Sequence, residues 1–247
     1  MSTFSRKAIF IPDHAMILAA GLGLRMRPLT ETTPKPLVNV AGKPLITYIL
    51  ELLSRAEIRN VVVNIHHLPE QMRRFATGVK DQNIVLSDEE DRLLDSGGGI
   101  KLALGALGRK PFLVFNADSF WIDGPRPNIV RLSEAWDPAA MDVLLLVASG
   151  AQITGYAGKG DFVMSSDARL VRRPERQVAP FVYTGVALMK PELFKNTPDG
   201  PFSLNLIFDR AIESGRLFGM RLDGEWIHVG TPDAIVDAEL KLLRSVL

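Results

Sequence analysis

The sequence predicts an α/β fold with a doubly wound sheet, and two features of the chain point to it. Apolar runs of strand length alternate with helical patterns through the first half of the 247 residues, and such alternation is typical of βαβ units. Glycine and charged residues directly follow the first of these apolar runs, where the carboxyl ends of strands border a ligand crevice. Apolar residues make up 47% and charged residues 23% of the chain, as in ordinary folded domains.

The first half of the chain supplies most of the predicted sheet. Its strands are buried, often β-branched runs bounded by turn residues, expected at Ala15–Ala20, Val61–Ile65, Ile84–Ser87, Pro111–Asp118 and Asp142–Ser149. Helical patterns lie between them, and one begins with a proline, which a first helical turn accepts. We expect these helices at Leu45–Ala56, Pro69–Thr77 and Gly99–Leu107.

The character of the sequence changes after Gly150. The next dozen residues are rich in glycine and predict a loop that leads into a hairpin around Ser165–Asp167. The remaining strands and helices are expected at Phe181–Met189, Ser203–Gly215, Glu225–Val229 and, after the Thr231-Pro232 cap, up to Leu247. The length favours one domain over residues 15–247, with the second half as a lobe, preceded by a surface arm at residues 1–14.

Charge and composition exclude several classes of partner. The formal net charge is +1, so no field of the whole protein favours nucleic acid or membrane binding. The absence of cysteine excludes disulfides and thiolate metal sites and fits a reducing cytosol. The apolar run Ala8–Ile11 is too short for a signal peptide, and no segment has the roughly 20 apolar residues that cross a bilayer. We expect a soluble, cytoplasmic protein, either monomeric or homodimeric.

The stretch "LAAGLGLRMRPLTETTPKPLVNV", which leaves the first strand, predicts a phosphate-binding loop. At Gly21 and Gly23 backbone amides can approach a phosphate without an intervening side chain. Arg25 offers a planar fork to phosphate oxygens, and Lys35 offers a point charge on a backbone stiffened by two flanking prolines. The spacing matches neither the dinucleotide fingerprint, because Met26 replaces its third glycine, nor the P-loop.

Taken whole, "LAAGLGLRMRPLT" followed by "PKPL" resembles the signature of sugar-1-phosphate nucleotidyltransferases. The resemblance implies a Rossmann-like, doubly wound mixed sheet of the nucleotidyltransferase type with a small sugar-binding lobe. It implies a nucleotide half at about residues 15–149, a sugar lobe at about 150–247, and the conversion of a nucleoside triphosphate and a sugar 1-phosphate into a nucleotide sugar and pyrophosphate. Arg25 and Lys35 are then catalytic, and the nucleotide-binding residues include Ala19, Ala20, Gly21 and Gly23. Leu24 departs from the pattern, since many relatives have a hydroxyl residue there.

Asp118 in "VFNADSF" follows a predicted strand at the same sheet edge and matches the N-x-D segment of the resembled family. Nucleotidyl transfer needs Mg²⁺ to neutralise charge on the phosphates. Asp118 is the expected ligand of this ion and, with Arg25 and Lys35, the third expected catalytic residue. The family's second metal aspartate lies in W-x-D-x-G-T, but this chain reads "WIHVGT" with His228 in its place. His228 could ligate the metal, contact phosphate as a cation, or be structural.

The run "DEEDRLLDSGGGIKLAL" is the main indication of the nucleotide. Gly97, Gly98 and Gly99 precede a predicted helix, so their free amides could face a base or its ribose. The run resembles E-x-x-L-L-E-T-G-G-G-I of the uridylyltransferases that charge N-acetylmuramate 1-phosphate in peptidoglycan recycling, and "GKGDF" points to the same group. The mannose-1-phosphate guanylyltransferases share the first motif and are the rival. A nucleotide-sensing relative without catalysis is a further alternative.

The sugar site is the least defined part of the sequence. "RRPERQVAPFVYTGV" is loosely similar to the E-K-P … N-A-G segment of the family, which implies sugar contacts at Arg173, Thr184 and Gly185, although a solvated basic face is an equal alternative. The lactyl carboxylate of N-acetylmuramate would need a cation, because burying its charge unpaired is costly. The cationic candidates for this contact are Lys159, Arg172, Arg173 and Arg176, and the two adjacent arginines could form a fork toward the carboxylate.

Overall fold

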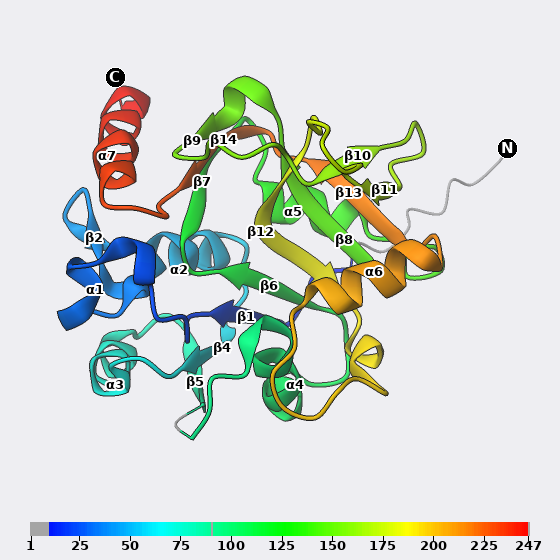
Figure 1. Ribbon diagram of the computed structural model, residues 1–247. Coiled ribbons are helices and arrows are strands. Elements are labelled where there is room, and N and C mark those ends of the chain that lie inside the picture. Colours follow the sequence, from blue (N-terminus) through cyan, green and yellow to red (C-terminus); the bar gives the residue numbers. More distant parts are fainter. Residues whose placement is uncertain (1–9, 90, 247) are drawn as a thin grey trace, which may run out of the picture.

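The computed structural model describes residues 10–89 and 91–246, and its centre is a seven-stranded mixed sheet in the order β13-β8-β12-β6-β1-β4-β5 (Figure 1). The α/β, mixed-sheet class predicted from the sequence is therefore confirmed. The predicted N-terminal arm lies largely outside the described residues, which begin at Phe10, and the last residue of the arm, His14, opens β1.

Four parallel strands form one side of the sheet: β1 (His14–Leu18), β4 (Asn60–Ile65), β5 (Asn83–Asp88) and β6 (Phe112–Asn116). The connecting helices are α2 (Leu45–Arg55), α3 (Pro69–Gly78) and α4 (Asp95–Leu107). Each predicted element of this region is present within a few residues. Helix α4 begins four residues before the predicted start, so the three glycines lie inside its first turns.

The second side of the sheet is mixed. Strand β12 (Val182–Met189) is antiparallel to both β6 and β8 (Val143–Ala148), and β13 (Leu217–Arg221), absent from the prediction, runs parallel to β8. Helices α5 (Asn128–Ala135), also unpredicted, and α6 (Asn205–Glu213) accompany these strands. The second half of the chain thus contributes directly to the central sheet.

Smaller sheets flank the large one. Strand β14 (Gly224–His228) pairs with β7 (Ser119–Asp123) and β9 (Ile153–Thr154), and β10 (Phe162–Met164) pairs with β11 (Leu170–Arg172) in the predicted hairpin. Strand β2 (Asn39–Val40) pairs with β3 (Lys43–Pro44), and the short α1 (Leu29–Thr32) and the terminal α7 (Asp233–Val246) complete the fold. The predicted strand through Asp118 ends at Asn116, because Ala117 and Asp118 form the turn into β7.

Alternate residues of β1 face two separate hydrophobic cores, as a strand covered on both faces requires. Ile17 lies in a core with residues of α2, α3 and α5, while Met16 lies in a core with residues of α4 and α6. A third core, built around Tyr48 stacked on Phe120 at 4.1 Å, joins the segment after β1 to β14 and α7. This third core holds the segment that follows β1 against the end of the sheet.

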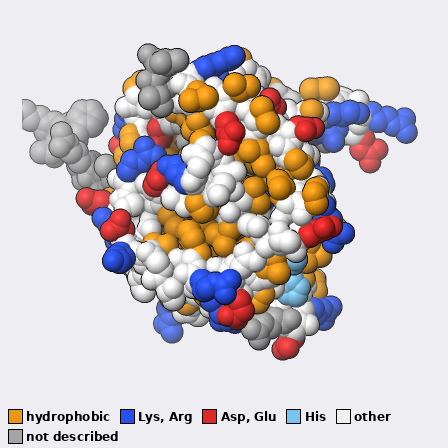
Figure 2. Space-filling view, turned by 90° about the vertical axis from the view of Figure 1, so that its left-hand side faces the viewer, with side chains coloured by type: hydrophobic (Ala, Val, Ile, Leu, Met, Phe, Trp, Pro, Cys, Tyr) orange, Lys and Arg blue, Asp and Glu red, His pale blue; other side chains and the backbone are white. Residues whose placement is uncertain are grey.

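Figure 2 views the side of the molecule on which α1, α3 and α7 lie in Figure 1. Hydrophobic side chains gather in a hollow near the centre of this face, and basic and acidic side chains are distributed around it. None of the helices in the described part of the chain combines the length and apolar character that crossing a bilayer requires.

Glycines in α4 permit a close approach between this helix and the segment before α6. A Cβ atom on Gly97 would lie 2.4 Å from the Phe202 ring, and one on Gly98 would lie 2.5 Å from the carbonyl oxygen of Gly200. Gly105, in the same helix, is exposed and has no atom within 4 Å of the corresponding position. Packing against residues 200–202 therefore explains the glycines at the start of α4.

We predict opposite effects on stability for alanine at two of these glycines. Gly98→Ala should lower the free energy of unfolding by about 1–3 kcal/mol, because a backbone carbonyl has to move. Gly105→Ala should raise it by up to about 1 kcal/mol, because alanine is the better helix former. Urea unfolding of both variants tests this, and a Gly98→Ala variant as stable as Gly105→Ala would contradict the packing described.

Candidate active site

The loop that follows β1 turns sharply at Gly23, which has a left-handed backbone with φ of +63°. A Cβ atom there would lie 2.8 Å from the Thr30 side chain, and the Thr30 hydroxyl donates to the Gly23 carbonyl at 2.8 Å. The backbone conformation and this close approach both require glycine. The turn leads directly into the short 3₁₀ helix Leu24–Met26, which carries Arg25.

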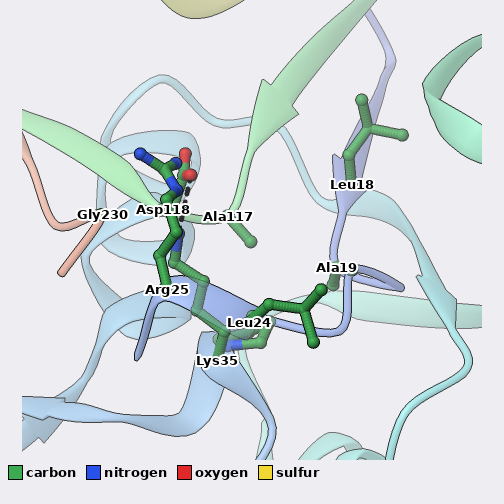
Figure 3. A pocket seen from close by; sticks show the side chains of 11 residues that line it. Leu18, Ala19, Leu24, Arg25, Lys35, Ala117, Asp118 and Gly230 are labelled. Carbon is green, nitrogen blue, oxygen red and sulfur yellow. Dashed lines mark hydrogen bonds and ion pairs between the residues drawn. The ribbon is translucent and has the colours of Figure 1, made fainter. Parts of the chain in front are cut away.

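Lys35 and Asp118 form the central contact of the site. The Lys35 ammonium donates to Asp118 Oδ2 at 2.8 Å, and the two side chains are only 14% and 24% exposed (Figure 3). Lys35 stands in a 3₁₀ turn between two prolines, and Asp118 stands in the turn that leaves β6. The pair joins segments 83 residues apart in the sequence.

His228, the last residue of β14, completes this charge cluster. Its Nδ1 lies 3.9 Å from Asp118 Oδ1, and its ring stacks on Trp226 with centroids 5.6 Å apart. Burial lowers the pKa of His228, and Lys35 and Arg25 lower it further, against the opposing pull of Asp118. The lowered pKa favours the neutral imidazole, which is the form that a metal ligand requires.

Asp118 remains ionised despite its burial. Burial alone would raise the pKa of its carboxyl group, but the charge and the hydrogen bond of Lys35, together with the charge of Arg25, act against burial, and the pKa is lowered. The cluster thus contains one fixed carboxylate and two fixed cations. A net positive charge beside a glycine loop suits a polyphosphate.

Six of the predicted site residues line one cavity of about 390 Å³ at the carboxyl end of β1, which we call the loop cavity. These are Ala19, Gly21, Gly23, Arg25, Lys35 and Asp118. Figure 3 shows the labelled members, with Leu18 and Ala19 on the β1 side and Gly230 opposite. The structure therefore brings together the residues that the first motif and the Asp118 segment singled out.

A second cavity of about 460 Å³ adjoins the first along the strand ends, and we call it the strand-end cavity. It shares Leu18 and Gly21 with the loop cavity, and its other lining residues include Ala20, Asn64, Glu89, Asp95, Ser96 and Asn116. The predicted nucleotide-binding residue Ala20 lies here.

Gly97, Gly98 and Gly99 are not among the residues that line these cavities. The prediction that their amides are free is wrong for the first two, whose N–H groups donate to the Phe202 carbonyl at 2.9 and 3.1 Å. Their glycine identity follows from the helix packing described above. At Gly99 a Cβ atom would lie 2.5 Å from Glu89 and 2.8 Å from Asn64. The residues just before the glycines, Asp95 and Ser96, face the strand-end cavity instead.

A buried polar network that the sequence analysis missed supports the strand-end cavity. Asn64 accepts a hydrogen bond from the Ala19 amide at 2.7 Å and donates to Glu89 at 2.7 Å, and Glu89 in turn accepts from the Leu94 amide at 2.8 Å. Asn64 and Glu89 are each 3% exposed. The signal in the sequence was the single polar residue inside the apolar run "VVVNI".

A third cavity, of about 640 Å³, lies on the other side of the charge cluster, and we call it the lobe cavity. It shares Arg25 and Asp118 with the loop cavity and is also lined by His228, Tyr156, Asp161, Thr184 and Gly185. The Thr184 hydroxyl is engaged within the core, where it donates to the Leu146 carbonyl, while Gly185 approaches Asn116 closely. The predicted sugar residues Thr184 and Gly185 thus lie beside the charge cluster.

Arg173, also predicted to contact the sugar, is not among the residues lining the lobe cavity. Its guanidinium donates to the backbone carbonyls of Gly160 and Gln177 at 3.0 and 2.8 Å. Arg172 pairs with Asp209 at 2.8 Å and donates to Asn205. Both arginines hold neighbouring segments of the chain in place, and neither lines the lobe cavity.

The donor set offers a divalent cation one carboxylate and one neutral imidazole, Asp118 and His228. Among the described residues no group of three His, Cys, Asp or Glu side chains could hold a metal ion. This fits Mg²⁺, which binds through one or two carboxylates and completes its shell with water and substrate phosphate oxygens.

A glycine loop, two cations and one carboxylate at the carboxyl edge of an α/β sheet define the site of an enzyme that handles nucleotide phosphates. The chain belongs to the Nucleotidyl transferase family, whose pattern matches residues 14–245. The family resemblance inferred from the first motif is confirmed.

Individual relatives agree with this assignment. The chain is 43% identical over 239 residues to N-acetylmuramate alpha-1-phosphate uridylyltransferase of Caulobacter vibrioides, covering 95% of this chain and 98% of that protein. It is 29% identical to a mannose-1-phosphate guanyltransferase of Hypocrea jecorina, covering 94% and 64% of the two chains. A UDP-glucose pyrophosphorylase solved with UDP-glucose has the same fold, with a TM-score of 0.77 and 15% identity over 95% of this chain and 100% of that one.

We predict that Glu89→Gln loosens the buried network. The amide places a donor group where Asn64 or the Leu94 amide already donates, so the variant should lose about 1–3 kcal/mol of unfolding free energy. The Ala19 amide, held by Asn64, should exchange its hydrogen faster. Asp91→Asn is the control, since Asp91 is exposed in the same loop. Equal stability and equal Ala19 exchange in the two variants would show that the network does not hold the loop.

Proposed function

We propose that this enzyme transfers the uridylyl group of UTP to N-acetylmuramate 1-phosphate, releasing pyrophosphate, as a step in the reuse of peptidoglycan sugars. The observation that carries the proposal is the Lys35–Asp118 pair with Arg25, placed between a strand-end cavity and a lobe cavity. The choice of uridine and of N-acetylmuramate is supported by the 43% identity to the Caulobacter uridylyltransferase over nearly the whole chain. The proposal locates the reaction in the cytoplasm, where nucleoside triphosphates are available.

The reaction is a direct displacement at the α-phosphorus. A phosphate oxygen of the sugar 1-phosphate forms a bond to the α-phosphorus of UTP, the bond from that phosphorus to the bridging oxygen breaks, and pyrophosphate leaves with the electron pair. No protein nucleophile is needed. Catalysis then consists of positioning two substrates and of stabilising the charge that develops on the phosphates.

The protein's own groups divide this work. The amides at Gly21 and Gly23 and the Arg25 guanidinium hold the triphosphate, and Lys35 places its ammonium at the reacting phosphates. Asp118 and Arg25, which line both the loop cavity and the lobe cavity, lie at the junction where the two substrates meet. We assign the strand-end cavity to the nucleoside and the lobe cavity, with Thr184 and Gly185, to the acceptor sugar.

We assign Mg²⁺ to Asp118, with His228 as its second ligand. When bound, the ion would neutralise charge on the phosphates of the substrates and on the departing pyrophosphate. The position of His228, with Nδ1 3.9 Å from the Asp118 carboxylate, and its lowered pKa support this assignment.

Pyrophosphate release from a panel of substrates tests the proposed function. The purified enzyme is given each of the four common nucleoside triphosphates with N-acetylmuramate, N-acetylglucosamine or mannose 1-phosphate. UTP with N-acetylmuramate 1-phosphate should give the highest kcat/KM. GTP with mannose 1-phosphate as the best pair would overturn the proposed substrates but not the reaction, and no turnover with any pair would favour a nucleotide-sensing protein.

The metal assignment predicts distinct behaviour for two variants. Asp118→Asn keeps the shape of the side chain but loses its charge, so metal-dependent turnover should fall to background. His228→Asp supplies a second carboxylate, and the Mg²⁺ concentration for half-maximal activity should fall because Mg²⁺ prefers oxygen ligands. Titration of activity with Mg²⁺ measures both effects. An unchanged Mg²⁺ dependence in His228→Asp would make His228 structural.

A further inference from the structure

A further cavity of about 750 Å³ opens beside the lobe cavity, and we call it the lateral cavity. It shares Tyr156, Gly158 and Val182 with the lobe cavity, so the two are contiguous. A Cβ atom on Gly158 would lie 2.1 Å from the Tyr156 hydroxyl oxygen, which shows how closely the glycine loop approaches this tyrosine. The lateral cavity therefore continues the lobe cavity past the Tyr156 ring.

The charged groups in the lateral cavity are all cationic. Lys159 and Arg221 line it, and no aspartate or glutamate does. Both residues are exposed, and within the described part of the chain neither has an ion-pair partner. The Arg221 guanidinium lies 5.8 Å from the centre of the Phe181 ring, a contact that holds the side chain beside the cavity without neutralising it.

The backbone around Lys159 is held in place by other contacts. The Ala179 amide donates to the Lys159 carbonyl at 2.8 Å, and Arg173 binds the carbonyls of Gly160 and Gln177 on the two sides of the loop. Arg221 ends β13, which is paired along its length with β8. Both cations therefore extend from ordered segments.

We propose that the lateral cavity receives the carboxylate-bearing substituent of the acceptor sugar, and that Lys159 and Arg221 are the specificity-determining residues that pair with it. This inference rests on the proposed function, in which the acceptor carries a lactyl carboxylate. A carboxylate moved from water into a protein cavity needs compensating donors, and an unneutralised pair of cations supplies them. Arg172 and Arg173 do not compete for this role, because neither lines the lateral cavity, Arg172 is paired with Asp209, and Arg173 donates to two backbone carbonyls.

Comparison of two acceptors tests the inference, because N-acetylglucosamine 1-phosphate has the same ring and phosphate but no carboxylate. In Lys159→Ala and in Arg221→Ala, kcat/KM for N-acetylmuramate 1-phosphate should fall about 10- to 100-fold. The value for N-acetylglucosamine 1-phosphate should change less than about 3-fold, because the reacting groups are untouched. Lys159→Arg and Arg221→Lys keep the charge and should retain most of the preference.

Lys195→Ala is the matched control, since it removes one positive charge from an exposed position that does not line the lateral cavity. It should leave the ratio of the two acceptors unchanged. The inference alone would be overturned if the wild-type enzyme prefers N-acetylmuramate 1-phosphate but the alanine variants lower kcat/KM equally for both acceptors. The same holds if the variants lower kcat/KM for neither acceptor. A wild-type enzyme that does not prefer this acceptor would overturn the proposed substrate and the inference together.

Discussion

The ion pair between Lys35 and Asp118 is the contact on which the site depends. It fastens the loop after β1 to the turn after β6, two strands that are neighbours and parallel in the sheet. Because both side chains are largely buried, removal of either would leave the other charge without its partner, which is costly in such surroundings. The third hydrophobic core, around Tyr48 and Phe120, holds the same loop from the other side.

This pair also sets the electrostatic character of the site. Lys35 and Arg25 together overcome the effect of burial on the pKa of Asp118 and keep it ionised, and they help to keep His228 neutral. The site therefore offers cations for phosphate, and an anion and a neutral imidazole for a divalent metal. These requirements belong to one reaction, in which highly charged phosphates must be brought together.

Local sequence patterns predicted the parallel half of the sheet and the loop cavity well. The strands there are continuous apolar runs, and the candidate site residues follow them directly in the chain. Asp118 could be placed with this loop because carboxyl ends of parallel strands share one edge. Strands β7 and β13 were missed, because a short strand beside a longer one has little periodicity of its own.

The remaining errors arose where distant contacts decide a residue's role. Gly97 and Gly98 resembled an exposed glycine loop, but Phe202 and Gly200, which lie far along the chain, pack against them. Arg173 resembled a sugar ligand, yet it donates to two backbone carbonyls and does not line the lobe cavity. Glu89 and Asn64 carried no recognisable motif, and only the fold brings them together beside Ala19.

Turnover of a Lys35→Ala variant tests the central claim most directly, with Lys80→Ala as a control that removes a cation away from the loop cavity. Lys35→Ala should lower kcat by roughly 100-fold or more while the protein still folds, because a preorganised charge is lost from the transition state. Lys80→Ala should retain near-wild-type kcat. If Lys35→Ala also turned over at nearly the wild-type rate, the loop cavity could not be the site of phosphate chemistry.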